Sequence, residues 1–377
     1  MESSRHPVVG SSLETLQLER AARFNRSQSI AMDILRGTAA LVVFLHHVNI
    51  YHLDRGWLDW LRPDIGHSAV VVFFVLSGYV IAASAARSRS ARRFAIKRFA
   101  RIYSVAIPAV LLAYGLAALS HGLGLPAFAP EYQLAKPLVY IGVGLTFIGQ
   151  LWGLGEPVFS NDPYWSLHYE AWYYVLFGAA VFARGAWRYV AVAALLAAMG
   201  PKLWALFPIW LGGAWVFWLR RYPAPSVGAS RVLVVVAAAA LVGLKLANVE
   251  DPVNAAVLGV LQPWLRWPLH HSSGPLGDLL VGLPTMLLVY AVGPARLVFP
   301  RVVVVPGRFL AEVSYSLYLT HLPLLLFFGV LLPSRPLAAV LAGFGCSVGF
   351  GLIFERQKEA LARLCEWVLP VRVPSQA

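Results

Sequence analysis

The chain has 377 residues, of which 59% are hydrophobic and only 13% are charged. Soluble globular domains carry about 25% charged residues, so this composition excludes a soluble fold, and it also excludes disordered and fibrous chains. The net charge of +13 would indicate a nucleic-acid partner in a soluble protein. In a membrane protein, basic loops on the cytoplasmic side explain it, and we expect no nucleic-acid partner.

Apolar runs long enough to cross a bilayer follow one another along most of the chain. They predict an all-α fold, a polytopic transmembrane helix bundle of about ten spans. We expect residues 1–29 to form a cytoplasmic N-terminal segment, residues 30–354 the transmembrane domain and residues 355–377 a cytoplasmic interfacial tail. The runs lie near 30–51, 68–86, 102–121, 164–183, 188–200, 203–219, 231–248, 277–294, 309–330 and 336–354.

One further run, 137–153, is rich in glycine and about 17 residues long, the lower limit for a span. If it stays on the outer side, Lys and Arg residues divide 23 inside to 7 outside; if it crosses, they divide 15 to 15. Positively charged residues favour the cytoplasmic side. The count therefore predicts that 137–153 is re-entrant or interfacial and that both termini are cytoplasmic.

The first run carries Asp33, Arg36 and His47, and charged groups within a span are costly enough to be functional candidates. Arg36 and His47 share one helical stripe, about 16 Å apart, whereas His46 points about 100° away. We therefore expect His46 to face packed helix or lipid. Two structural alternatives stay open: an Asp33–Arg36 ion pair that holds the helix in the bundle, and a His47 that only forms hydrogen bonds.

The segment 87–101 holds seven positively charged residues and no acid. Lys97 and Arg98 lie four and three residues before Arg101, so on a helix the three side chains can converge on one anion. Arginine forks match phosphate oxygens, which favours a site for a phosphate-bearing donor. An anchor on anionic lipid is the equal alternative.

The fourth run begins with polar and aromatic residues. The run opens from the outer side, where an acceptor would enter, so we expect Glu170 on that side. Ser166 and Glu170 share a helix face, and Glu170 lies deep enough to need a partner. For Tyr164 and Trp165, an aromatic anchor at the membrane interface is the favoured interpretation.

The ninth run carries Ser314, Tyr318 and His321 at positions i, i+4 and i+7, on one stripe. Such a stripe can contribute to a reaction site, or it can simply join helices by hydrogen bonds.

Taken in this order, these clusters resemble the acyltransferase family 3 membrane proteins. The resemblance covers residues 33–321, and its specificity comes from five motifs in the right order. The matching residues are Asp33–Ala40 with His47, Phe73–Tyr79, Arg98–Tyr103, Trp165–Leu167 with Glu170, and Ser314–Leu319 with His321.

The resemblance implies a multi-pass enzyme of the bacterial inner membrane. Such enzymes move an acyl group, usually acetyl, from cytoplasmic acetyl-CoA or another acyl-CoA to a hydroxyl of an extracytoplasmic glycan or glycoside. It implies that His47 is the essential histidine, Arg36 its partner, Arg98 and Arg101 the paired arginines, and Glu170 the conserved acid. The residues expected to contact or support substrates are Asp33, Ser77, Trp165, Ser166, Tyr318 and His321.

The chemistry of the residues agrees with this. Transfer from a thioester needs a base for the hydroxyl proton, which neutral histidine suits, and a donor to the developing oxyanion, for which Arg36, Tyr318 and His321 are candidates. Whether His47 is a general base or carries the acyl group itself stays open. Two positions depart from the family, Ser104 and Arg356, where proline is usual.

A proton-coupled transporter or flippase of a glycan intermediate is the alternative function, because intramembrane acids, histidines and arginines also form proton relays. We expect the lipid bilayer and an extracytoplasmic carbohydrate as partners, and a homo-oligomer is compatible with the sequence. The two cysteines, in unlike surroundings, predict neither a disulfide nor a metal site, and we expect no metal cofactor.

Overall fold

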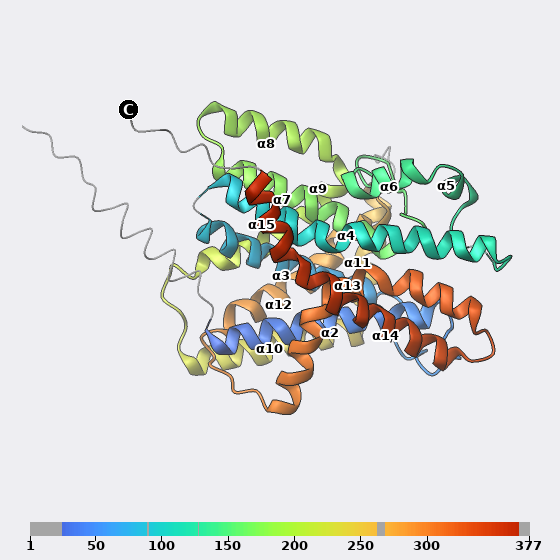
Figure 1. Cartoon of the computed structure of the whole chain (residues 1–377). Coiled ribbons are helices and arrows are strands. Elements are labelled where there is room, and N and C mark those ends of the chain that lie inside the picture. The colour runs from blue at the N-terminus through green and yellow to red at the C-terminus, as the bar shows by residue number, and fades with distance from the viewer. Residues whose placement is uncertain (1–24, 89, 127, 262–267, 369–377) are drawn as a thin grey trace, which may run out of the picture.

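The computed structural model describes residues 25–88, 90–126, 128–261 and 268–368. Most of the predicted N-terminal segment and the end of the predicted tail lie outside these residues. The described chain is helical and contains no strand element (Figure 1). Its helices are α2 (Arg26–Ile50), α3 (Ile65–Arg87), α4 (Ala91–Gly122), α5 (Glu131–Ala135), α6 (Pro137–Thr146), α7 (Trp165–Phe182), α8 (Ala186–Met199), α9 (Pro201–Leu219), α10 (Val227–Ala247), α11 (Glu250–Leu261), α12 (Pro275–Val292), α13 (Arg301–Leu331), α14 (Pro336–Phe354) and α15 (Lys358–Val368).

Eight helices of the described chain are long and apolar enough to cross a membrane, which confirms the all-α polytopic bundle. They are α2, α3, α4, α9, α10, α12, α13 and α14, the last continuing into α15. The two other predicted spans coincide with α7 and α8. Helix α7 begins with polar residues such as His168 and Glu170, and α8 has 14 residues, about 21 Å of helix.

The run 137–153 contains only one short helix, α6, of ten residues. Ten residues of α-helix measure about 15 Å, half the thickness of the hydrocarbon core. The helix ends at Phe147 in a left-handed conformation, and the chain continues as a loop. Gln133 holds this loop, since its amide donates to the Pro157 carbonyl and accepts from the Phe159 N–H, both at 2.9 Å. The geometry supports a segment that does not cross.

Glycines let two pairs of helices pack with their backbones almost in contact. A Cβ atom added at Gly37 of α2 would lie 2.8 Å from the Leu310 Cβ of α13. A Cβ at Gly78 of α3 would lie 1.9 Å from the carbonyl oxygen of Trp210 in α9, and one at Gly213 would lie 2.1 Å from the Val75 carbonyl oxygen. These contacts fix α3, which lines all three cavities described below.

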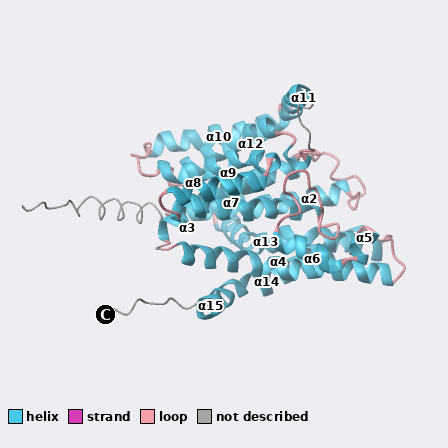
Figure 2. Cartoon of the chain, turned by 90° about the horizontal axis from the view of Figure 1, so that it is seen from above, coloured by secondary structure: helices cyan, strands magenta, loops and turns pink. Residues whose placement is uncertain are grey.

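The described chain begins and ends toward the same end of the bundle. Figure 2 shows α15 at that end and α5, α6 and α11 at the opposite end. We call the first end inner and the second outer, following the predicted topology. Helix α15, predicted to lie at the inner membrane surface, packs beside α4 and has no buried residue.

Candidate active site

An inner cavity lies between α2, α3, α4, α7 and α13. Its lining combines apolar side chains with three arginines and one carboxylate, so its charge is net positive. The polar residues that line it are Arg36, Ser77, Arg98, Arg101, Ser166, Glu170, Tyr174, Ser314, Tyr315 and Tyr318.

Arg36 extends from α2 into this cavity. Its Nη2 donates to the Ala311 carbonyl of α13 at 2.6 Å, while its buried Nε has no hydrogen-bond partner in the described structure. Within the described chain, no ion pair joins Arg36 to Asp33. Asp33 lines neither this cavity nor the outer cavity described below. A simple ion pair therefore does not explain Arg36, which keeps a donor available for an anion.

Arg98 and Arg101 reach the cavity from α4, as their spacing predicts. Arg98 lies 5.9 Å from the centre of the Tyr174 ring, and its buried Nε is also without a partner in the described structure. Arg101 already has an acid, since its guanidinium is 3.6 Å from the Glu355 carboxylate. Lys97 is exposed and does not line the cavity, so the expected convergence of all three cations does not occur.

Glu170 is held by hydroxyl donors. Ser77 Oγ donates to Glu170 Oε1 at 2.5 Å, the Tyr174 hydroxyl donates to the same oxygen, and Trp210 Nε1 donates to Ser77 Oγ at 3.1 Å. We expected Glu170 on the outer side, where an acceptor would enter. Its side chain instead lines the inner cavity with the arginines, because the face it shares with Tyr174 turns toward α3 and α4.

An outer cavity lies toward the other end of α2 and α3, beside the start of α7 and Tyr318 of α13. His47 of α2 lines it and is 8% exposed. His46 lines it too, which corrects the expectation that His46 faces only packed helix or lipid. A Cβ at Gly66 would lie 2.3 Å from His46 Cδ2, so His46 packs against the start of α3 beside the cavity.

His321 lies behind His47 and lines neither cavity. His47 Nδ1 is 2.8 Å from the Val43 carbonyl and 3.2 Å from His321 Nε2. His321 Nδ1 is 2.9 Å from the Leu317 and Tyr318 carbonyls. Carbonyls only accept, so we assign the proton of each ring to Nδ1. The Val43 carbonyl and, at the longer distance, His321 Nε2 then share the His47 Nδ1–H as acceptors, and His47 Nε2 keeps its lone pair.

The two cavities adjoin. Tyr318 of α13 and Val70 of α3 line both of them. The Tyr318 hydroxyl is 2.8 Å from Ser166 Oγ, which joins α13 to the start of α7. The predicted stripe on α13 thus passes both cavities. Ser314 lines the inner cavity, Tyr318 lies at the junction, and His321 contacts His47.

Aromatic and acidic side chains form the wall of the outer cavity. Trp165 stacks with His271 at 4.5 Å and with His67 at 5.9 Å between ring centres. His271 Nε2 is 3.4 Å from Asp162 Oδ1, and His67 Nε2 is 2.8 Å from the buried Asp278 Oδ1. Burial raises the pKa of Asp162, but its contact with His271 outweighs this and leaves that pKa below the ordinary value.

Trp165 and Tyr164 are 6% and 0% exposed. They are therefore not interface anchors, and the interpretation favoured from the sequence is wrong for both. Their rings pack inside the bundle, where Asn161, just before them, donates from Nδ2 to the Leu319 carbonyl of α13 at 2.7 Å.

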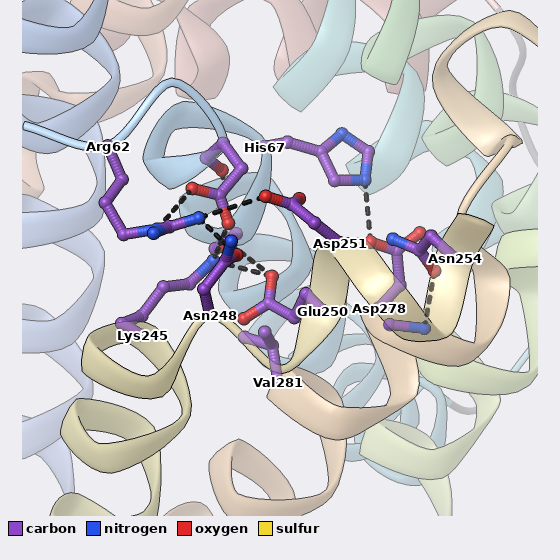
Figure 3. A network of polar contacts seen from close by, with 12 residues as sticks. Arg62, His67, Lys245, Asn248, Glu250, Asp251, Asn254, Asp278 and Val281 are labelled. Atoms are coloured by element: carbon purple, nitrogen blue, oxygen red, sulfur yellow. Dashed lines mark hydrogen bonds and ion pairs between the residues drawn. The ribbon is translucent and has the colours of Figure 1, made fainter. Parts of the chain in front are cut away.

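A polar network fixes the start of α3 against α10 and α11 (Figure 3). Lys245 Nζ donates to Asp64 and to Glu250 at 2.6 Å each, and Arg62 pairs with Asp64 and Asp251 at 3.1 Å each. Burial raises the pKa of Asp64, but the opposite effect of Lys245 and Arg62 is larger, so this pKa lies below its ordinary value. Burial keeps the pKa of Glu250 above its ordinary value despite Lys245.

Three polar residues of the site were not predicted. Glu355 pairs with Arg101 and accepts from the Ser316 N–H at 2.8 Å, and His67 and Asp278 form the pair of the outer wall. Asp278 is an acid inside a predicted span, so the rule that selected Asp33 would also have selected it. Glu355 and His67 sit at the edges of apolar runs, where a polar residue carries no such signal.

Groups of three or more potential metal ligands do not occur among the described residues.

Comparison with known proteins gives two matches. A family described as an acyltransferase domain, Acyl_transf_3, matches residues 29–356. An O-acetyl transferase of Shigella phage Sf6 is 30% identical over 162 residues, which are 41% of this chain and 46% of that protein. The chain therefore spans about half the length of this curated relative. No solved structure matches the chain.

Proposed function

Since the chain belongs to acyltransferase family 3, we propose that it transfers an acyl group, with acetyl as the expected group, from a cytoplasmic acyl-CoA to a hydroxyl of an extracytoplasmic glycan or glycoside. The proposed location is the bacterial inner membrane. The relative is named an O-acetyl transferase, which supports the acetyl group and the hydroxyl acceptor.

The observation that carries this proposal is the pair of adjoining cavities. The inner one has a net positive lining with unpartnered Nε atoms on Arg36 and Arg98, which suits the phosphates of CoA. The outer one presents His47, and Tyr318 lies where the two adjoin. A donor and an acceptor that enter from opposite ends would meet at this junction.

In the proposed direct transfer, His47 Nε2 removes the proton of the acceptor hydroxyl. The alkoxide attacks the thioester carbonyl carbon, and the resulting oxyanion accepts hydrogen bonds. The carbon–sulfur bond then breaks, and the leaving CoA thiolate takes the proton from the His47 imidazolium. His321 Nε2, which accepts from His47 Nδ1–H, would stabilise that imidazolium and hold the ring in place.

Tyr318 is the proposed oxyanion donor. When Ser166 donates to the Tyr318 oxygen, the proton of Tyr318 is available for the oxyanion at the junction. His321 is a poor donor here, because it lines neither cavity and its Nδ1 already faces two carbonyls. Glu170, Ser77 and Tyr174 would position the donor end of the site.

Membrane vesicles from the native strain, which contain the acceptor, test this function. With labelled acetyl-CoA we expect label in the glycan fraction and an equal release of CoA, both lost when the gene is deleted. A transporter or flippase would move its cargo without consuming thioester. Thioester consumption that is the same with and without the gene would contradict the proposal.

A further inference from the structure

A second inner cavity lies on the opposite side of α3, between the inner ends of α2, α9, α10 and α12. It contains about 1020 Å³ of space that no protein atom fills, open solvent at its mouth included. Tyr79 of α3 lines it, whereas Ser77, two residues earlier, lines the cavity of the candidate active site. Among the described residues, none lines both cavities, so this one is a separate feature.

The described lining of this cavity is basic, since it contains Arg220 and Arg296 and no acid. Within this lining, Arg220 Nη1 donates to the Tyr79 hydroxyl oxygen at 3.3 Å, and Gln28 Nε2 donates to the same oxygen at 2.6 Å. Tyr79 and Gln28 are buried. These bonds hold the Arg220 guanidinium at the wall of the cavity, while Arg296 is exposed at its rim.

The N-terminus of α10 adds to the positive potential. Ser226, the N-cap residue, and Val227, the first residue of this 21-residue helix, both line the cavity. A helix N-terminus favours an anion, here beside two arginines. The lining also has an apolar part, which includes Val216, Leu219 and Val289. The combination fits a ligand with an anionic head and an apolar tail.

We propose that this cavity binds the phosphate headgroup of an anionic membrane phospholipid. The arginines and the start of α10 would hold the phosphate, and the upper part of an acyl chain would lie against the apolar lining. The cavity opens at the predicted inner end of the bundle, where the anionic lipid leaflet attracts arginine. A free phosphate would satisfy only the arginines and would leave the apolar lining uncovered.

Native mass spectrometry of the purified full-length protein, titrated with phosphatidylglycerol or phosphatidylcholine, tests the proposal. We expect preferential retention of phosphatidylglycerol, and a loss of about tenfold or more in the double variant Arg220→Ala/Arg296→Ala. Because Arg220 also contacts Tyr79, the single variant Arg296→Glu, on an exposed side chain, provides a second test and should lose most of the preference while staying folded.

Arg221→Ala/Arg301→Ala is the matched control. It removes two charges from the same end of the bundle, but neither residue lines the cavity, and Arg221 lies over the Trp218 ring. This variant should keep the preference. An equal loss in the control would overturn the proposal. So would competition by inorganic phosphate at lipid-like concentrations, or retention of CoA in place of lipid that depends on Arg220 and Arg296.

Discussion

The three arginines of the inner cavity differ in how their charges are balanced. Arg101 lies beside Glu355, so its charge is largely compensated inside the protein. Arg36 and Arg98 each keep a buried Nε without a partner in the described structure. Leaving a buried donor unpaired costs about 1–3 kcal/mol, so these two sites are most stable with an anion bound. Arg98 should therefore contribute more to donor affinity than Arg101.

Replacing Arg98 with Ala should raise the Kd for CoA about ten- to a hundredfold, the value of one charge-assisted hydrogen bond. Lys97→Ala is the control, because the neighbouring Lys97 is exposed and does not line the cavity. Calorimetric titration of the purified protein with CoA measures both. If Arg98→Ala and wild type bind CoA with equal affinity, the CoA phosphates do not bind at Arg98.

In the proposed mechanism His321 is a positioning residue, because it contacts His47 and lines neither cavity. We expect His321→Ala to slow acetyl transfer in membrane vesicles at least about tenfold while CoA affinity stays the same. His321→Gln should recover part of the rate, because the amide oxygen can accept from His47 Nδ1–H. An Ala variant as fast as wild type, or a Gln variant no better than Ala, would contradict the assigned tautomers.

At the scale of helices, α3 connects the parts of the site. Its residues line both inner cavities and the outer one, and glycines fix its distance from α9. A close-packed interface has no room for an added methyl group unless a backbone moves. The glycine of the Phe73–Tyr79 motif is thus explained by packing against Trp210.

Gly78→Ala should lower the melting temperature measured by tryptophan fluorescence, by an amount equivalent to at least about 1–3 kcal/mol, because its Cβ would overlap the Trp210 carbonyl. Gly115→Ala in α4 is the control, since a Cβ there meets nothing within 4 Å. Alanine is the better helix former, so this control should be neutral or slightly stabilising. A Gly78→Ala protein as stable as wild type would show that α3 and α9 are less closely packed.

Helical spacing predicted much of the site, and contacts between distant helices could not be predicted. The spacing placed Arg36 and His47 on the interior face of α2, and both line cavities. It could not give the rotation of α7 relative to α3 and α4, which turns Glu170 toward the inner cavity. Pairs such as Arg101–Glu355 depend on helices more than 200 residues apart in sequence, and no local pattern reports them.

At the scale of the whole molecule, the described chain begins and ends toward the same end of the bundle, which requires an even number of crossings (Figure 2). The short α6 explains how the run 137–153 can leave that number even. The composition predicted the helical bundle correctly, because so few charged residues cannot cover a soluble surface. Which end faces the cytoplasm depends on the Lys and Arg count alone and remains a prediction.

Cysteine labelling tests this orientation. In a variant whose two native cysteines are replaced by Ser, we expect Glu131→Cys and Leu154→Cys, which lie before and after α6, to react with an impermeant reagent from outside intact cells. Arg363→Cys on α15 should react only after permeabilisation. Protection of Leu154→Cys while Glu131→Cys reacts would mean that the segment between them crosses the membrane.

In the proposed mechanism, His47 performs acyl transfer at the junction of the two cavities. The direct test is mass spectrometry of surface glycans from a strain in which the gene is deleted. This strain is complemented with the wild-type gene or with the His47→Ala or His46→Ala variant. A general base contributes about 10²–10⁴-fold, so His47→Ala should abolish acetylation while the purified protein still binds CoA. The neighbouring His46 also lines the outer cavity, but its ring packs against Gly66 at the start of α3, so His46→Ala should stay within about tenfold of wild type. Full acetylation with His47→Ala would contradict the account.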